Sequence, residues 1–240
     1  MFKKKRVLGI TLARGGSKQV KNKNIRKILG QPLIAYTIKE SLKSKYLTRY
    51  IVSTDNNQIK NISQKYDAET PFLRPKKYAK DTSTSVSALQ HAVKWIEKSE
   101  NTIYDYIVEI MCTNPLKKSI DIDNVIKKII NTSADTVIAV NKIEDHHPMR
   151  VKKIIKDKIV DFCMKEKAES RRQDLRPLAY VRSGSIYAID RNFLMKKSLR
   201  YGSKNSRPYI LPDSRAINID NEADFTTASV ILKNSNEKKI

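Results

Sequence analysis

Short apolar runs alternate with longer amphipathic segments along most of the chain. The runs are partly β-branched and end in glycine or small polar residues, as is typical of strands buried on both faces of a parallel sheet. They occupy residues 7–12, 49–55, 106–111 and 136–140. Between them, apolar residues recur every three or four positions, which predicts helices at residues 31–42, 57–66, 85–96 and 122–130. The alternation predicts an α/β fold with an open parallel sheet.

The alternation breaks after residue 140. Residues 151–162 predict a β-hairpin that turns at Lys156–Lys158, and a charged segment, 165–174, follows it. Neither extends the main sheet readily, so we expect residues 141–180 to form a small β-rich arm that pairs with a second protomer. The expected organisation is an α/β core at 1–140, the arm at 141–180 and a return to the core at 181–240.

The core pattern resumes after this arm. We expect a strand at 179–189, a helix near Asn192, a strand-like segment at 215–220 and a last helix that includes Phe225 and Leu232. Chain ends commonly fray, so the tail from residue 234 is predicted to be poorly ordered.

The turn after the first apolar run combines glycines with cations. Gly15 and Gly16 can adopt positive φ and direct backbone N–H groups into one concavity. Arg14, Lys18, Lys21 and Lys23 place positive charge in the same segment, and this combination suits a polyphosphate. The spacing matches neither a dinucleotide-binding glycine motif nor a Walker loop, and an ordinary solvated basic turn is the alternative.

Other polar groups follow the later strands. Ligands of open parallel sheets bind beyond the carboxyl ends of the strands, so Arg14, Asp55 and the residues after 111 should face one crevice. The hydroxyl-rich segment 80–85 begins a helix, and its side chains either cap that helix or contact a ligand.

The net charge of +23 restricts the choice of partner. A charge of this size attracts nucleic acid or any other polyanion. The lysines are dispersed, however, and no zinc-finger, recognition-helix or RNP-like pattern accompanies them, which does not favour nucleic acid. Attraction of an anionic small substrate is the preferred explanation.

Three further observations bear on metals and on the compartment. Cys112 and Cys163 lack metal-ligand spacing, so both are expected to be reduced, buried thiols. The three histidines indicate no metal site. No stretch approaches the roughly 20 apolar residues of a membrane span, and the start at 1–6 lacks the apolar core of a signal peptide. A cytoplasmic protein with no membrane contact is therefore expected.

Several short motifs, taken together, resemble those of the acylneuraminate cytidylyltransferases. The first group is Ala13-Arg14-Gly15-Gly16-Ser17-Lys18 with Lys23-Asn24, Ile51-Val52-Ser53-Thr54-Asp55, Leu73-Arg74-Pro75 with Asp81-Thr82, and Thr113-Asn114-Pro115-Leu116. The second is Asp145-His146-His147-Pro148, Arg172-Gln173-Asp174-Leu175, Ser183-Gly184-Ser185-Ile186-Tyr187 and Asn218-Ile219-Asp220. The motifs run nearly end to end.

The resemblance implies a Rossmann-like α/β nucleotidyltransferase sheet with a dimerisation arm, active as a homodimer with Mg2+. Its substrates would be CTP and a nonulosonic acid. The implied catalytic residues are Arg14, Lys23 and Asp220, the last as the magnesium ligand. The implied nucleotide-binding residues are Arg14, Gly15, Gly16, Ser17, Lys23, Asn24, Arg74 and Ser85. The implied sugar-binding residues are Arg150, Arg172 and Tyr187, the two arginines in part from the neighbouring protomer.

The chain departs from the family pattern at three places. Asn218 replaces the first of two aspartates at the metal site, Met111–Pro115 replaces a Gln-Pro-Thr-Ser-Pro segment, and Ser183 replaces the asparagine of an Asn-Gly pair. These positions face the sugar or the metal, so a sugar acid other than N-acetylneuraminate, first of all a legionaminic type, is expected. Two competing hypotheses remain: an inactive nucleotide-binding homologue, which Asn218 would permit, and a basic nucleic-acid binder.

Overall fold

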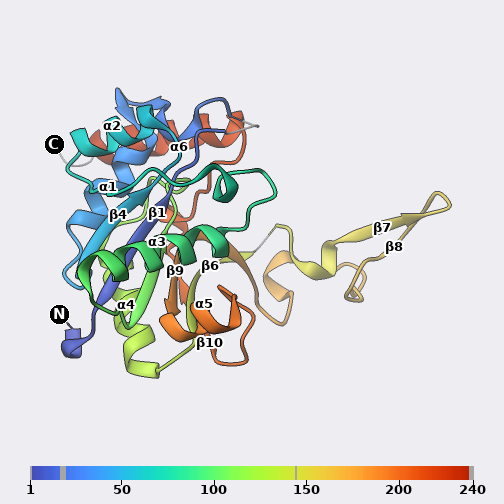
Figure 1. Cartoon of the computed structure of the whole chain (residues 1–240). Coiled ribbons are helices and arrows are strands. Elements are labelled where there is room, and N and C mark those ends of the chain that lie inside the picture. The colour runs from blue at the N-terminus through green and yellow to red at the C-terminus, as the bar shows by residue number, and fades with distance from the viewer. Residues whose placement is uncertain (1, 17–19, 144, 238–240) are drawn as a thin grey trace.

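A six-stranded mixed sheet forms the centre of the molecule (Figure 1). The computed structural model describes residues 2–16, 20–143 and 145–237. The strands, in their spatial order, are β10 (Ser206–Ile210), β6 (Thr136–Ile143), β9 (Ala179–Asp190), β5 (Tyr106–Ile110), β1 (Val7–Leu12) and β4 (Arg49–Ser53). β1 pairs in parallel with β4 and β5, and β6 with β10. The expected α/β class is therefore confirmed.

The expectation of a parallel sheet is wrong at one strand. β9 lies between β5 and β6 and is antiparallel to both. Burial on both faces made β9 recognisable as a strand, but an apolar pattern carries no information about strand direction. β10 was not predicted, because it lies at the sheet edge and its Ser-Arg-Pro-Tyr-Ile sequence has no apolar alternation.

Helices cover both faces of the sheet. Their bounds are α1 (Leu33–Leu42), α2 (Asn57–Lys65), α3 (Ser85–Glu100), α4 (Ser119–Thr132), α5 (Arg191–Lys197) and α6 (Glu222–Glu237). Buried residues of α1, α2 and α4 pack on one face, and those of α3 and α5 on the other. Apolar side chains of α6 pack with Val20, Ile28 and Leu116 in a third cluster. Successive residues of β1, such as Val7 and Leu8, enter opposite layers, which explains its unbroken apolar run.

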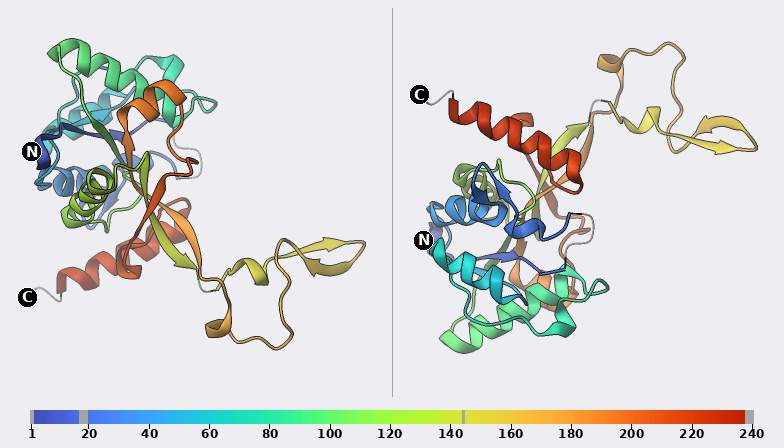
Figure 2. Two further views of the ribbon diagram at one scale, coloured as in Figure 1. Left: turned by 90° about the horizontal axis from the view of Figure 1, so that it is seen from below. Right: turned by 90° about the horizontal axis from the view of Figure 1, so that it is seen from above.

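The segment 145–178, here called the arm, projects from this α/β body (Figure 2). Its hairpin pairs β7 (Lys152–Ile155) with β8 (Lys158–Asp161), so the predicted hairpin is confirmed. Ile154 and Ile159 on it are 77% and 75% exposed. The base of the arm is a ribbon in which the ends of β6 and β9 pair from Asn141↔Val181 to Ile143↔Ala179, so the main sheet does continue into this region.

Three smaller expectations are corrected. Residues 215–220 form no strand; a 3-10 turn, Asp213–Arg215, leads into irregular backbone that hydrogen-bonds to neighbouring loops. α6 continues to Glu237, past the residue at which fraying was predicted. Cys112 is buried as expected, but Cys163 is exposed. None of the described helices is long and apolar enough to cross a membrane.

Candidate active site

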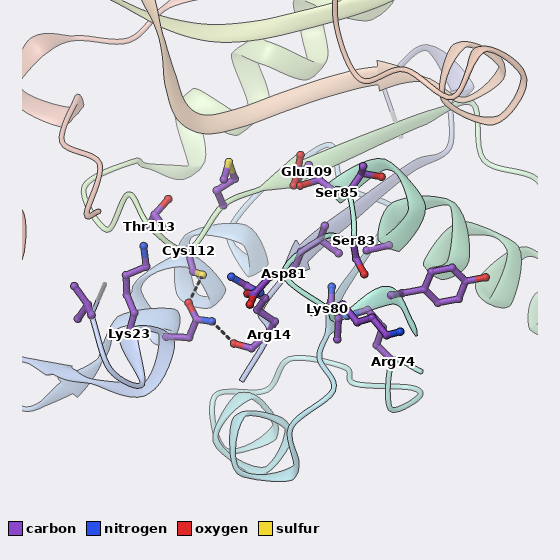
Figure 3. A pocket seen from close by; sticks show the side chains of 18 residues that line it. Arg14, Lys23, Arg74, Lys80, Asp81, Ser83, Ser85, Glu109, Cys112 and Thr113 are labelled. Atoms are coloured by element: carbon purple, nitrogen blue, oxygen red, sulfur yellow. Dashed lines mark hydrogen bonds and ion pairs between the residues drawn. The ribbon is translucent and has the colours of Figure 1, made fainter. Parts of the chain in front are cut away.

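A cavity of about 520 Å³ opens at the carboxyl ends of β1 and β5. Its walls include Leu12, Arg14, Lys23, Asn24, Arg74, Asp81, Ser83, Ser85, Glu109, Met111, Cys112 and Thr113. In Figure 3, Lys23 and Thr113 lie at one side of the cavity, Arg74 and Ser83 at the other, and Arg14 between them. The location agrees with the prediction that ligands bind beyond the strand ends of such a sheet.

The glycine turn after β1 lies tightly against α2. The backbone N–H of Gly15 donates to Asp55 Oδ1 at 3.0 Å, and a Cβ at this residue would lie 2.8 Å from the side-chain amide of Asn56. Neither Gly15 nor Gly16 has positive φ, so the expected reason for glycine is wrong at both positions. Gly15 is needed for the close approach of Asn56, which caps α2. Ser17, predicted to bind nucleotide, lies outside the described residues.

Two guanidinium groups enter the cavity. Arg14 forms an ion pair with Asp81, and Arg74 is only 5% exposed with Nη2 3.8 Å from Asp55 Oδ1. Burial lowers the pKa of Arg74; Asp55 opposes this change and the charge of Arg14 adds to it. Crowded positive charge of this kind is relieved by an anionic ligand. Arg14 and the residues after β5 thus meet in one crevice, as predicted. Asp55 does not line it and instead contacts Gly15 and Arg74, which corrects that part of the prediction.

Asn24 and Lys23 connect the glycine turn to the rest of the cavity. Asn24 is buried; its Nδ2 donates to the Arg14 carbonyl at 3.0 Å, and its Oδ1 accepts from the Cys112 thiol at 3.0 Å. Lys23 Nζ donates to the Ile219 carbonyl at 2.8 Å and lies 3.6 Å from Asp220 Oδ1. The predicted phosphate-binding lysine and the predicted metal ligand are therefore neighbours.

Asp220 lies at the open edge of this region, with its side chain 61% exposed. Asn218 Nδ2 donates to Asp220 Oδ2 at 2.6 Å, while Asn218 Oδ1 is buried and has no hydrogen-bond partner. The described residues contain no cluster of three metal-ligating side chains. A metal ion here would depend on Asp220, an amide oxygen and the phosphates of a substrate.

The hydroxyl-rich start of α3 caps the helix and also lines the cavity. Thr84 caps the helix by accepting from the Ser87 N–H at 3.2 Å. Ser83, Thr84 and Ser85 also line the cavity.

The three predicted sugar-binding residues do not line the cavity. Arg172 pairs with Asp145 at 2.8 Å and Arg150 lies 3.6 Å from Glu166, and all four residues belong to the arm. Tyr187 on β9 is buried beneath the Arg200 guanidinium, which lies 4.5 Å from its ring centroid.

Sequence reasoning missed Glu109. This carboxylate is fully buried in β5, lines the cavity and accepts from Arg200 Nη1 at 2.5 Å. Burial raises the pKa of Glu109, and Arg200 opposes that change. The available signal was a single charged residue in the apolar run 106–111. Arg200 has no comparable sequence signal, because it lies in an irregular loop.

Comparison with known proteins identifies the family of the chain. The cytidylyltransferase family profile matches residues 8–205. The chain is 30% identical to the pseudaminic acid cytidylyltransferase of Campylobacter jejuni subsp. jejuni serotype O:23/36 (strain 81-176), over 96% of this chain and 97% of that protein. It is also 30% identical to the CMP-N,N'-diacetyllegionaminic acid synthase of Campylobacter jejuni subsp. jejuni serotype O:2, over 96% of both.

A solved structure shares the fold. CMP:2-keto-3-deoxy-manno-octonic acid synthetase, determined in complex with CTP, superimposes with a TM-score of 0.70 at 15% identity, covering 96% of this chain and 99% of that one. The chain therefore belongs to the cytidylyltransferase family and is a nucleotidyltransferase.

Proposed function

We propose that this protein joins CTP to a nonulosonic acid of the legionaminic or pseudaminic kind, with release of pyrophosphate. Relatives of both kinds are equally similar in sequence. The observation that carries the proposal is the convergence of Arg14, Lys23 and Arg74 on one cavity at the carboxyl ends of the strands. Three cations suit the triphosphate of a nucleotide.

Within this cavity, Arg14 and Lys23 bind the phosphates. Gly15 and Gly16 are assigned to the nucleotide on the resemblance, since neither lines the cavity and the Gly15 N–H donates to Asp55 Oδ1. Asn24, Arg74 and Ser85 lie near the nucleoside. The proposal is supported by the fact that these side chains line the same cavity. Asn24 connects the cavity to the glycine turn through its hydrogen bond to the Arg14 carbonyl. Ser17 is assigned to the nucleotide on the resemblance alone.

We assign Mg2+ to Asp220. Hard oxygen ligands suit this ion, which commonly uses one or two carboxylates and completes its shell with waters and substrate phosphates. The exposed Asp220 carboxylate fits that requirement, and rotation of the Asn218 amide, which now turns its Nδ2 toward Asp220, would bring its oxygen to the same ion. When bound, the ion neutralises charge on the transferring phosphate and the departing pyrophosphate.

The reaction needs little from the protein beyond position and charge. The anomeric oxygen of the sugar forms a bond to the α-phosphorus of CTP as the bond between that phosphorus and the bridging oxygen of pyrophosphate breaks. Arg14 and Lys23 stabilise the charge that develops on these oxygens. Their fixed positions beside the glycine turn hold the triphosphate in one orientation.

In the proposed homodimer, the arm both pairs the two protomers and brings arginines to the partner's cavity. Exposed apolar residues on the hairpin, Ile154 and Ile159, favour burial against a partner. In that dimer Arg150 and Arg172 of the arm would reach the neighbouring cavity and bind the sugar carboxylate or a phosphate, since a guanidinium binds such groups bidentately. Tyr187 would lie beside the sugar. A biosynthetic enzyme of this type would act in the cytoplasm, where CTP is made.

Pyrophosphate release tests the proposal. Purified protein, CTP and Mg2+ are incubated with legionaminic, pseudaminic and N-acetylneuraminic acids, and the CMP-sugar is identified by mass spectrometry. We expect turnover with one of the first two acids and much weaker turnover with N-acetylneuraminate. CTP binding without turnover of any acid would favour an inactive homologue. Salt-dependent retention of DNA or RNA with no CTP binding would favour a nucleic-acid binder.

A further inference from the structure

Lys117 is a fully buried lysine behind the proposed active site. It lies between the end of β5 and the start of α4, and it is the largest of the fully buried side chains. Its Nζ donates to Thr37 Oγ1 at 2.7 Å, to the Met111 carbonyl at 2.6 Å and to the Asn114 carbonyl at 2.5 Å. The described hydrogen-bond partners are thus three uncharged oxygens and no carboxylate.

These partners match the charged form of the side chain. An ammonium group has three N–H donors and no acceptor, so each hydrogen of Lys117 meets one oxygen. A neutral amine has two N–H donors and a lone pair. One of the three oxygens would then face that lone pair without a hydrogen bond, at the cost of a buried unsatisfied acceptor.

The carbonyls held by Lys117 begin and end the turn Met111–Asn114, which contacts the glycine turn. Cys112 in its middle donates to Asn24 Oδ1, and Asn24 in turn donates to the carbonyl of Arg14. This chain of contacts fixes one proposed phosphate-binding residue relative to β5.

The same turn contacts the proposed metal segment. The carbonyl of Thr113 accepts from the N–H of Ile219 at 2.8 Å, and the carbonyl of Ile219 accepts from Lys23. Asn114 Nδ2 donates to the Arg215 carbonyl at 2.8 Å, at the start of this segment. The turn is therefore where the Arg14 side and the Asp220 side of the cavity are joined.

We propose that Lys117 is a positioning residue: its buried ammonium fixes the turn Met111–Asn114 and thereby aligns Arg14 with Asp220. The proposal rests on the site assignment made above. Lys117 lines no part of the cavity wall and contacts no substrate in this arrangement. It acts through the backbone that carries Cys112 and Thr113.

The charge of Lys117 should make activity depend on pH. Burial lowers the pKa of Lys117 to about 7; Cys112 of the turn, Glu40 of α1 and Asp121 of α4 act in the opposite direction. Burial also raises the pKa of Cys112, which stays a neutral thiol, and Asp121 is paired with Arg215. Above neutral pH the ammonium loses its proton, the turn loses one hydrogen bond, and kcat should fall.

Two substitutions and one matched control test this role in the full-length protein. Lys117→Met removes the ammonium, and Thr37→Val removes one acceptor with little change of shape. Asp123→Asn is the control, because Asp123 of α4 is likewise buried, accepts from Ser44 and the Lys45 N–H, and does not line the cavity. Melting temperature, CTP affinity, kcat between pH 6 and 9, and deuterium uptake by the peptide that contains Ile219 are measured.

We expect Lys117→Met to lower kcat about 100-fold, the size of effect that a small misplacement of reacting groups produces. CTP affinity should change little, and the alkaline decline of kcat should disappear. Thr37→Val should move that decline to lower pH, because fewer acceptors favour the ammonium less. Both variants should speed deuterium uptake at Ile219. Asp123→Asn should change neither the pH profile of kcat nor this uptake.

The proposal is wrong if both variants keep the kcat, pH profile and deuterium uptake of Asp123→Asn. If Lys117→Met does not fold, Thr37→Val decides by the same measurements. If wild-type protein turns over no sugar acid, the proposed function fails, and deuterium uptake at Ile219 still tests the positioning role separately.

Discussion

The α/β body and the arm use basic residues in different ways. In the body, Arg74 and Lys117 are buried; Arg74 lies beside Asp55, and Lys117 donates hydrogen bonds to backbone oxygens. In the arm, the side chain of Arg172 is 53% exposed and pairs with Asp145 on the same arm. The body thus gathers cations at one cavity, whereas the arm carries exposed cations that do not line it.

If the arm acts on a second protomer, removing its hairpin should reduce turnover more than any other change. Replacing residues 151–162 with a short Gly-Ser linker should turn a dimer into a monomer and reduce turnover by about 1000-fold, since partner arginines would no longer reach the cavity. CTP binding by the body should persist. Sizing with light scattering measures the first effect, and a variant that stays dimeric would assign the arm another purpose.

Asp220→Asn tests the open edge of the body. Loss of the one proposed carboxylate ligand should reduce Mg2+-dependent turnover about 1000-fold and raise the magnesium concentration needed for half activity. Asp67→Asn is a useful control, because Asp67 is exposed after α2 and does not line the cavity. An unchanged magnesium titration in Asp220→Asn contradicts the metal assignment.

Arg14→Ala tests the inner part of the cavity. Removing one preorganised cation should lower kcat/KM for CTP about 100-fold while the melting temperature stays within a few degrees of wild type. Lys21→Ala, on the same turn but exposed and outside the cavity wall, should have little effect. Equal losses in the two variants would mean that overall charge, and not a site, attracts the nucleotide.

Stability against pH gives the smallest expected effect. The pKa of Lys117 is about 7 in the folded protein and near its ordinary value of 10.5 after unfolding, so the unfolded chain holds more protons between these limits. Its contribution to the free energy of unfolding should therefore rise above pH 7, by roughly 1 kcal/mol per pH unit. Urea denaturation of wild type and Lys117→Met from pH 7 to 9 measures the free energy of unfolding of wild type relative to the variant, which should rise with pH; a constant difference contradicts the lowered pKa of Lys117.

The body was more predictable than the arm because burial leaves a clear mark on sequence. β1, β4 and β5 were found from apolar runs, and the helices from their spacing. The direction of β9 was not predicted, because the alternation of side chains is the same in a parallel and an antiparallel strand. Residues 215–220 alternate like a strand, yet their hydrogen bonds go to loops such as the turn that carries Thr113.

The site itself was only partly predictable. The glycine turn and Arg74 were found through motifs, and the cavity brings them together. Glu109 and Lys117 were missed because one charged residue in an apolar run, or one lysine after a turn, indicates nothing without its surroundings. Tertiary contacts alone show that Lys117 bonds to Met111 and Asn114.

The central claim is that the cavity beside the glycine turn binds a nucleoside triphosphate. Titration calorimetry with CTP and Mg2+ tests this claim most directly. We predict one site per chain for wild-type protein, with affinity at least tenfold weaker in Arg14→Ala and unchanged in Lys21→Ala. Well-folded wild-type protein that gives no binding heat and no thermal stabilisation with CTP would contradict it.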